Sequence, residues 1–365
     1  MKKVIFVVSS LNSGGIENYL LRFLNYFDGQ IEPIVICKGN VFGELEEDYK
    51  KVRHIQLIKM KVGYFNLNSY YAIYTILKKS KAQSVCDFTG NFAGLVLLMA
   101  NFAGIKNRIS FYRGSSNHFK ETKIKLLYNL IMLQLVKWNA TKIFSNSYAA
   151  LDYFYSNRDK NDTKFKTIYN GIDAKKFNSI TNKFKKEDFG IPSNGFVVGH
   201  TGRYNAAKNH DTIIEVAEKL CAIYPNIYFM LCGKDTEVFL TKYILNNSIL
   251  KDKVKILGYR NDICNILPVF DVYFFPSTTE GQPNSLIEAM IAGLPIVASN
   301  IGPIIETIPE ILHNDLLNPM DVEGFCIRLE EYYFSKQKRE EDNFSSWAIE
   351  RFAAEALFNQ FYKEL

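Results

Sequence analysis

Short apolar runs rich in β-branched residues alternate with longer amphipathic stretches along the whole chain. An apolar run of about four to eight residues between turn residues predicts a buried strand, and apolar residues at helical spacing predict a helix. Strands are expected at residues 4–9, 34–37, 55–58, 84–88, 108–112, 142–146 and 166–169, and in a second series at 196–201, 227–232, 254–257, 272–276 and 295–299. This alternation predicts the α/β class, with doubly wound parallel sheets.

The amphipathic stretches predict helices at residues 17–26, 67–79, 92–103, 120–138, 211–223, 262–267 and 284–292. A polar, lysine-rich stretch follows Asn170-Gly171-Ile172-Asp173 and separates the two series of strands. We therefore expect an N-terminal domain at residues 1–175 and a C-terminal domain at 176–344, with a terminal helix at about 345–365 packed at their junction. Parallel sheets bind ligands beyond the carboxyl ends of their strands, so the expected site is a cleft between the two domains.

The composition is that of a folded globular protein, because 47% of the residues are hydrophobic and 22% are charged. The six cysteines include no C-x-x-C pair and no histidine at zinc-finger spacing, which argues against a disulfide framework and a zinc site. The first apolar run is too short for a secretory signal, and no segment reaches the ~20 apolar residues that span a bilayer.

Charge divides the chain into two unequal halves, although the total is only +6. Residues 1–180 contain 26 Lys and Arg against 13 Asp and Glu, whereas residues 181–365 contain 18 against 25. A basic half is typical of proteins that bind an anionic membrane, a phosphorylated ligand or nucleic acid, although a solvated surface gives the same balance. The basic half has no recognisable nucleic-acid module, so nucleic acid is not an expected partner.

The first strand leads into a turn that contains Gly14 and Gly15 and opens a helix. Paired glycines let the backbone approach a ligand closely, and the N–H groups at a helix start can meet a phosphate. A simple tight turn is the alternative. The turn does not read G-x-G-x-x-G, and the P-loop pattern G-x-x-x-x-G-K-[ST] is absent from the chain, which argues against a dinucleotide-dependent dehydrogenase and a P-loop enzyme.

The loop after the first strand of the second domain carries Arg203 and Lys208, five residues apart. The planar fork of an arginine and the point charge of a lysine together suit a diphosphate, unless both side chains only face solvent. After the strand at 272–276, Glu280 precedes a helix that begins near residue 283, and Glu288 lies about two turns along that helix.

The first-turn N–H groups of that helix, at Asn284 and Ser285, can receive a phosphate. A ribose attached to this phosphate would then lie near Glu288. The alternative is an ordinary helix that carries solvated glutamates.

The motifs of the second domain form one continuous pattern. They are Gly202-Arg203, Lys208-Asn209, Leu257-Gly258, Asp271-Val272, Pro276-Ser277, Glu280-Gly281, Glu288-Ala289-Met290, Gly293-Leu294-Pro295-Ile296-Val297-Ala298, and Gly302 with Glu306. This pattern resembles family 4 of the retaining glycosyltransferases, of the bacterial surface-polysaccharide type. The resemblance implies the GT-B fold, in which two Rossmann-like, doubly wound domains face each other across a cleft. It is strongest from about residue 196 to 306 and looser toward the N-terminus.

The resemblance also implies a role for each motif. Arg203 and Lys208 would hold the donor diphosphate, Glu288 would bind the ribose, and Glu280 would contact the transferred sugar. The donor site would be completed by Gly14, Gly15, Asn284 and Ser285, and by Tyr259 to Asp262 at the base. No D-x-D sequence occurs, which fits a metal-independent site without a cofactor. The expected donor is a UDP-sugar, ahead of a GDP-sugar.

Many members of this family carry a catalytic histidine near the end of the strand that corresponds here to residues 108–112. Arg113 is its counterpart by register and His118 is its counterpart by chemistry, so both are candidates. Gly302-Pro303 replaces a more usual Gly-Gly pair, which places donor contacts on that loop in doubt.

The implied reaction transfers a hexose or related sugar to a glycan or a polyprenyl-diphosphate-linked acceptor on the N-terminal domain. Lys120, Lys123, Lys125 and Lys137 interleave with apolar residues up to position 138, a composition that can lie on an anionic membrane. A core helix with a lysine edge is the alternative. We expect a cytoplasmic enzyme, peripheral on the inner face of the cell membrane. The rival hypotheses are a non-catalytic sugar-recognition protein and a nucleotide-sugar epimerase or phosphorylase of the same fold.

Overall fold

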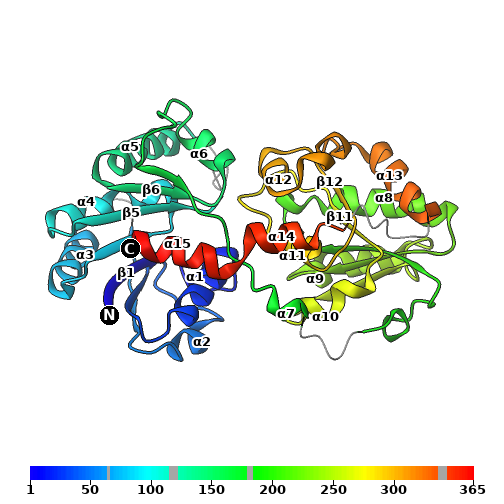
Figure 1. Ribbon diagram of the computed structural model, residues 1–365, viewed down its shortest axis with the longest axis horizontal. Coiled ribbons are helices and arrows are strands. Elements are labelled where there is room, and N and C mark those ends of the chain that lie inside the picture. Colours follow the sequence, from blue (N-terminus) through cyan, green and yellow to red (C-terminus); the bar gives the residue numbers. More distant parts are fainter. Residues whose placement is uncertain (64–65, 115–121, 179–183, 336–342) are drawn as a thin grey trace. The chain divides into compact units, whose positions relative to one another are not determined.

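The computed structural model describes residues 1–63, 66–114, 122–178, 184–335 and 343–365 (Figure 1). The chain forms two compact units. The N-terminal unit comprises Met1–Gly171 and Glu355–Leu365, and the C-terminal unit comprises Ile172–Ala354. Each unit contains one parallel sheet with helices on both sides, and every strand predicted from the sequence is present.

The N-terminal unit has a seven-stranded sheet in the order β3-β2-β1-β4-β5-β6-β7. Its strands are β1 (Lys2–Val8), β2 (Ile31–Cys37), β3 (Gln56–Lys59), β4 (Ser84–Asp87), β5 (Asn107–Tyr112), β6 (Lys142–Ser145) and β7 (Phe165–Thr167). The order reverses at β1, which pairs with β2 on one side and with β4 on the other. This reversal creates a topological switch point, where parallel sheets bind ligands.

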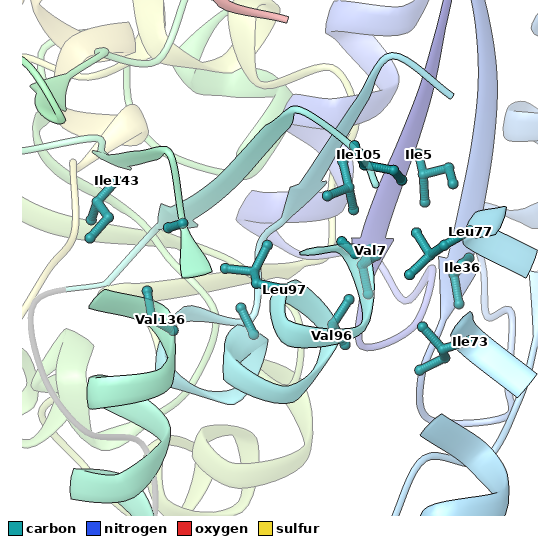
Figure 2. Close-up of a cluster of buried hydrophobic side chains, with 14 of the residues drawn as sticks. Ile5, Val7, Ile36, Ile73, Leu77, Val96, Leu97, Ile105, Val136 and Ile143 are labelled. Carbon is teal, nitrogen blue, oxygen red and sulfur yellow. The ribbon is translucent and has the colours of Figure 1, made fainter. Parts of the chain in front are cut away.

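Side chains of β1 alternate between the two faces of the sheet, and each face is covered by different helices. Ile5 and Val7 pack in the core beneath α3 (Leu67–Ser80), α4 (Gly94–Phe102) and α5 (Lys123–Asn139) (Figure 2). Phe6 points to the other face, where its ring meets Phe23 of α1 (Gly15–Tyr26). The last helix, α15 (Ala354–Glu364), adds Phe361 to this aromatic layer, 4.8 Å from Phe23 between ring centroids. Two shorter helices, α2 (Glu46–Lys50) and α6 (Tyr148–Phe154), complete the unit.

The C-terminal unit has a five-stranded sheet in the order β10-β9-β8-β11-β12. Its strands are β8 (Phe196–Thr201), β9 (Ile227–Cys232), β10 (Val254–Gly258), β11 (Val272–Phe275) and β12 (Ile296–Ala298). The helices are α7 (Lys175–Asn178), α8 (His210–Ile223), α9 (Thr236–Asn246), α10 (Ile263–Ile266), α11 (Asn284–Ile291), α12 (Gly302–Thr307), α13 (Val322–Ser335) and α14 (Ser345–Phe352). The core joins Val198, Phe229 and Phe274 of the sheet to helices such as α8 and α13.

The C-terminal segment, expected as one helix, forms two. Ala353 interrupts the helix in an extended conformation and pairs with Ile172 in a parallel bridge. The Ile172 N–H donates to Phe352 O at 2.9 Å, and the Ala354 N–H donates back to Ile172 O at 3.1 Å. These hydrogen bonds replace those of a continuous helix, so the segment divides into two helices at Ala353. Helix α14 belongs to the C-terminal unit, and α15 from Glu355 onward belongs to the N-terminal unit. Within the described ranges, no helix combines the length and the hydropathy that a membrane crossing requires.

Candidate active site

The predicted donor residues of the C-terminal unit follow the carboxyl ends of three strands. Arg203 follows β8, Glu280 follows β11, and Tyr259 follows β10. Lys208 ends a short 3-10 turn just before α8, and Glu288 lies on α11. Because the strands are parallel, all these loops emerge at the same edge of the sheet.

Hydrogen bonds join the loop after β8 to the loop after β11. The side-chain amide of Asn209 donates to Pro276 O at 3.0 Å, and the Thr278 N–H donates to Ala207 O at 2.9 Å. Asn209 has a φ of 56°, a left-handed conformation that asparagine tolerates better than most residues. The two loops therefore form one connected surface, although about 70 residues separate them in the sequence.

This connection brings Lys208 and Glu280 together. Lys208 Nζ lies 2.6 Å from Glu280 Oε1, and the two side chains are only 17% and 11% exposed. The ammonium also lies 4.7 Å from the centroid of the Phe275 ring, within the range of a cation–π interaction. The structure thus places in one ion pair the two residues that the sequence assigns to the diphosphate and to the sugar.

Arg203 is exposed on a loop whose backbone is fixed on both sides. The Gly202 N–H donates to Cys232 O at 2.8 Å, and the Tyr204 N–H donates to Lys234 O at 2.9 Å. Glycine is required at position 233, because a Cβ there would lie 1.8 Å from the carbonyl oxygen of Gly202. This close approach holds the Arg203 loop against the end of β9.

Helix α11 carries three of the predicted donor residues. Pro283 precedes it and provides no side-chain cap, so the first-turn N–H groups of Asn284 and Ser285 begin the helix as predicted. The buried Tyr273 hydroxyl is 2.7 Å from Thr201 Oγ1 and also bonds the Ser285 side chain. Burial, with a contribution from the nearby Glu288, raises the pKa of Tyr273, so this phenol stays protonated and links α11 to the end of β8.

The turn after β10 presents Tyr259 at 61% exposure. Gly258 has a φ of 60°, in the left-handed region that favours glycine, and a Cβ there would displace the Glu237 carboxylate. Asp262 is held by the Arg260 guanidinium through hydrogen bonds of 2.8 and 2.6 Å, and this pairing lowers the pKa of Asp262. The Asp262 side chain is thus engaged by its neighbour, while the Tyr259 ring stays open to a ligand.

In the N-terminal unit, the surroundings of Gly14 and Gly15 are acidic. The Glu17 carboxylate lies 2.6 Å from where a Cβ of Gly14 would be, and Glu44 accepts the Ser13 N–H at 2.7 Å. A Cβ at Gly15 would meet nothing within 4 Å, so packing does not require glycine there. Negative charge beside the start of α1 opposes phosphate binding, whereas the open space around Gly15 leaves room for a ligand.

Arg113 directly follows β5 and is half-buried. Its guanidinium carbon lies 3.7 Å from the centroid of the Tyr19 ring, and Nη1 has no hydrogen-bond partner among the described residues. Burial lowers the pKa of Arg113 to about 10, which still leaves it charged at neutral pH. The other candidate for this role, His118, lies outside the described residues.

Comparison with known proteins relates the chain to glycosyltransferases. The model of the family described as glycosyl transferases group 1 matches residues 181–339. The chain is 29% identical over 296 residues to the UDP-Gal:alpha-D-GlcNAc-diphosphoundecaprenol alpha-1,3-galactosyltransferase of Escherichia coli, with 76% of this chain and 69% of that protein covered. It is 26% identical to the capsular polysaccharide biosynthesis glycosyltransferase CapH of Staphylococcus aureus, with 82% of each chain covered. The protein is a glycosyltransferase, and its residues 181–339 match the group 1 model.

Solved structures show that this glycosyltransferase has the GT-B fold. The Anabaena protein Alr3699/HepE, solved in complex with UDP and glucose, matches with a TM-score of 0.80 at 20% identity and covers 100% of this chain and 99% of its own. A glycosyltransferase of Rickettsia africae matches with a TM-score of 0.79 at 21% identity, over 99% and 97% of the two chains. The predicted fold class and the predicted family resemblance are therefore confirmed.

Two buried histidines of the glycosyltransferase had no predicted role. His200 lies next to the last residue of β8, with Nδ1 2.9 Å from Phe274 O, and its ring centroid is 5.2 Å from that of His210. His200 Nε2 and both ring nitrogens of His210 have no hydrogen-bond partner among the described residues. Burial, assisted by the Lys208 charge, lowers the pKa of His210 to about 4 and the pKa of His200 well below its ordinary value. Both rings are neutral at pH 7, so they add no repulsion to Lys208.

Proposed function

We propose that this glycosyltransferase uses a UDP-sugar, and transfers its hexose or related sugar with retention to a glycan or a polyprenyl-diphosphate-linked acceptor in cell-surface polysaccharide biosynthesis. The names of its relatives support this proposal, since one uses UDP-Gal and a diphosphoundecaprenol-linked sugar and another acts in capsule formation. The observation that carries the proposal is the joined pair of loops that presents Arg203, Lys208 and Glu280 on one edge of the sheet.

The chemistry that such a site supplies is stabilisation of a departing diphosphate. Glycosyl transfer breaks a bond between carbon and a phosphate oxygen, and negative charge grows on the leaving group as this bond breaks. This negative charge is stabilised by the Lys208 ammonium, the Arg203 guanidinium and the first N–H groups of α11. Glu280 holds Lys208 in position before the donor binds, and its carboxylate then bonds a hydroxyl of the sugar. These groups replace a divalent cation in the proposed mechanism, and no cofactor takes part.

The base and the ribose take the two remaining positions in this proposal. The uracil stacks on or near the exposed Tyr259, and the ribose hydroxyls donate to the Glu288 carboxylate. The HepE structures in complex with UDP and with UDP-glucose support UDP over GDP as the nucleotide.

For the acceptor, we propose that the N-terminal unit works at the inner face of the cytoplasmic membrane. Helix α5 buries Tyr128, Met132 and Val136 against the core, yet other apolar residues of the same helix face solvent. Ile124, Leu127, Leu130 and Trp138 are 83%, 61%, 56% and 73% exposed. A helix with a core face and a second apolar surface beside lysines can rest on an anionic bilayer. Lys120 of the predicted basic cluster lies outside the described residues, whereas Lys123, Lys125 and Lys137 lie on α5.

Release of free UDP from UDP-sugars, measured with and without membrane-lipid acceptors, tests the proposed reaction. A glycosyltransferase releases UDP only slowly until the acceptor is added. A sugar-recognition protein would release none, and an epimerase would convert the donor without any acceptor. NMR of the anomeric proton then decides the stereochemistry, because an α-linked donor must yield an α-linked product if the configuration is retained.

A further inference from the structure

Tyr273 carries a buried hydroxyl that side-chain packing alone does not require. It lies on β11 and is fully buried. Its ring stacks on that of Phe275 at 5.9 Å and on that of His200 at 6.4 Å between centroids. A phenylalanine would make the same stacking contacts. Burying a hydroxyl costs free energy unless the group is hydrogen-bonded, so the partners of this phenol indicate what it does.

The phenol makes three contacts with Thr201. Its oxygen lies 2.7 Å from Thr201 Oγ1, donates to Thr201 O at 3.2 Å and accepts the Thr201 N–H at 3.3 Å. Thr201 is the last residue of β8 and precedes Arg203 by two residues. Tyr273 therefore holds the point at which the Arg203 loop leaves the sheet.

The same hydroxyl also bonds the side chain of Ser285, the second residue of α11. The Ser285 N–H is one of the two helix-start groups that are proposed to meet the diphosphate. Pro283, which precedes the helix, provides no side-chain cap, so the bond from Tyr273 ties down a first turn that its own N-cap residue does not hold. One hydroxyl thereby connects the Arg203 loop with the start of α11.

The Arg203 loop and α11 follow different strands, yet in the proposed mechanism both act on one diphosphate. Donors that are fixed in advance stabilise a departing anion better than donors that must first reorganise. We propose that Tyr273 is a positioning residue for the donor diphosphate, and that its hydroxyl fixes the start of α11 relative to the Arg203 loop. This inference deepens the proposed function and rests on it, because the diphosphate site is part of that proposal.

Binding of UDP and of uridine to the full chain tests the inference, since both ligands carry the base and the ribose but only UDP carries the phosphates. The dissociation constant of uridine, from ligand-observed NMR, divided by that of UDP, from calorimetry, gives the factor that the phosphates add to affinity. Tyr273→Phe keeps the ring and removes the hydroxyl. This phosphate factor should fall about 5- to 10-fold, while uridine affinity stays within about twofold of the parent. A hydroxyl that only stabilised the fold would leave the phosphate factor unchanged.

Thr201 provides further variants that test the same link. Thr201→Val removes the Oγ1 contact and should lower the phosphate factor, whereas Thr201→Ser keeps the hydroxyl and should bind like the parent. These two variants make the test even if Tyr273→Phe does not fold. The double variant Tyr273→Phe/Thr201→Val should lose less than the product of the two single losses, because both changes break one link.

The matched control is Tyr228→Phe. Tyr228 is a buried tyrosine near the amino end of β9, and its hydroxyl accepts a hydrogen bond from Lys253 at 3.4 Å. This variant loses a buried hydroxyl of the same sheet away from the proposed site, so it should keep the phosphate factor of the parent.

Three results would overturn the inference: an unchanged phosphate factor in Tyr273→Phe, an equal fall in Tyr228→Phe, or losses that multiply in the double variant. A parent that binds UDP no more tightly than uridine would refute the diphosphate site, and the inference with it. A phosphate factor that is high in the parent and in Tyr273→Phe alike would refute the inference alone, so the two failures are distinguishable.

Discussion

Neutralising either partner of the Lys208–Glu280 ion pair tests whether Lys208 binds the diphosphate and Glu280 binds the sugar, as proposed. At 2.6 Å and with both side chains mostly buried, loss of one partner leaves the other charge uncompensated. Breaking a fully buried pair costs about 3–5 kcal/mol. Because both groups keep some solvent contact at the edge of the sheet, we expect a loss of about 1–3 kcal/mol in the free energy of unfolding for Lys208→Met or Glu280→Gln. The double variant should lose less than the sum, by about 1–2 kcal/mol.

Binding of the donor gives the sharper test of the same pair. Lys208→Met removes a charge-assisted contact worth about 1.5–3 kcal/mol, so calorimetry should show UDP binding about 10- to 150-fold weaker. Glu280→Gln leaves the ammonium in place and should leave UDP affinity unchanged or higher, while the affinity for the UDP-sugar falls. Lys219→Met, which breaks an exposed pair of the same unit, is the control and should bind UDP like the parent. Equal losses of UDP affinity in Lys208→Met and Glu280→Gln would refute the division of roles.

Three further outcomes are expected. Glu288→Ala should weaken UDP and the UDP-sugar by the same factor in calorimetry, since the ribose is common to both ligands; a loss confined to the UDP-sugar would contradict the ribose assignment. Burial lowers the pKa of His210 to about 4, so the stability that the neutral ring contributes is complete above pH 6.5 and is lost toward pH 4. Urea unfolding of the parent and of His210→Leu at pH 7 and pH 4 tests this. Between pH 7 and pH 4, the free energy of unfolding should fall by about 3 kcal/mol more in the parent than in His210→Leu. An equal loss in the two proteins would mean that another group titrates. In flotation assays, the enzyme should float with anionic liposomes at low salt but not at high salt. The double variant Lys123→Glu/Lys125→Glu should not float with them at either salt concentration. Flotation that does not depend on lipid charge would argue against electrostatic docking.

The sequence predicted the strands well because each is a compact apolar run, and it predicted helices less well. Helix α9 was missed, since Val238, Phe239 and Leu245 are 74%, 58% and 63% exposed. Apolar residues on the outer face of a helix hide the periodicity that marks a buried face. The break at Ala353 between α14 and α15 was also missed, because it depends on a bridge to Ile172, far away in the sequence.

Residue types, spacing and the family resemblance assign side chains to the proposed donor site, but they could not predict how those side chains pair. Lys208 and Glu280 meet because β8 and β11 are neighbours in the sheet and because Asn209 bonds the loop after β11. A similar contact joins Lys38, which follows β2, to Asp87, which ends β4 on the other side of β1. Predicting either pair requires the order of the strands within the sheet, whereas a single sequence indicates only where the strands lie along the chain.

The ion pairs at the carboxyl edges of the two sheets differ in the exposure of their carboxylates. In the C-terminal unit, Gly233 lets the carbonyl of Gly202 approach closely, and Arg203 is exposed on the loop held there. The Glu280 partner of Lys208 is 11% exposed, and in the proposed mechanism it turns to a sugar hydroxyl when the diphosphate binds. In the N-terminal unit, the carboxylate partner of Lys38 is fully buried and cannot leave. An accessible counter-ion allows a lysine to exchange its partner for a phosphate, whereas an enclosed counter-ion holds the lysine in a pair that has no net charge. The exposure of the acidic partner therefore favours the pair at Lys208, rather than the pair at Lys38, as the proposed diphosphate site.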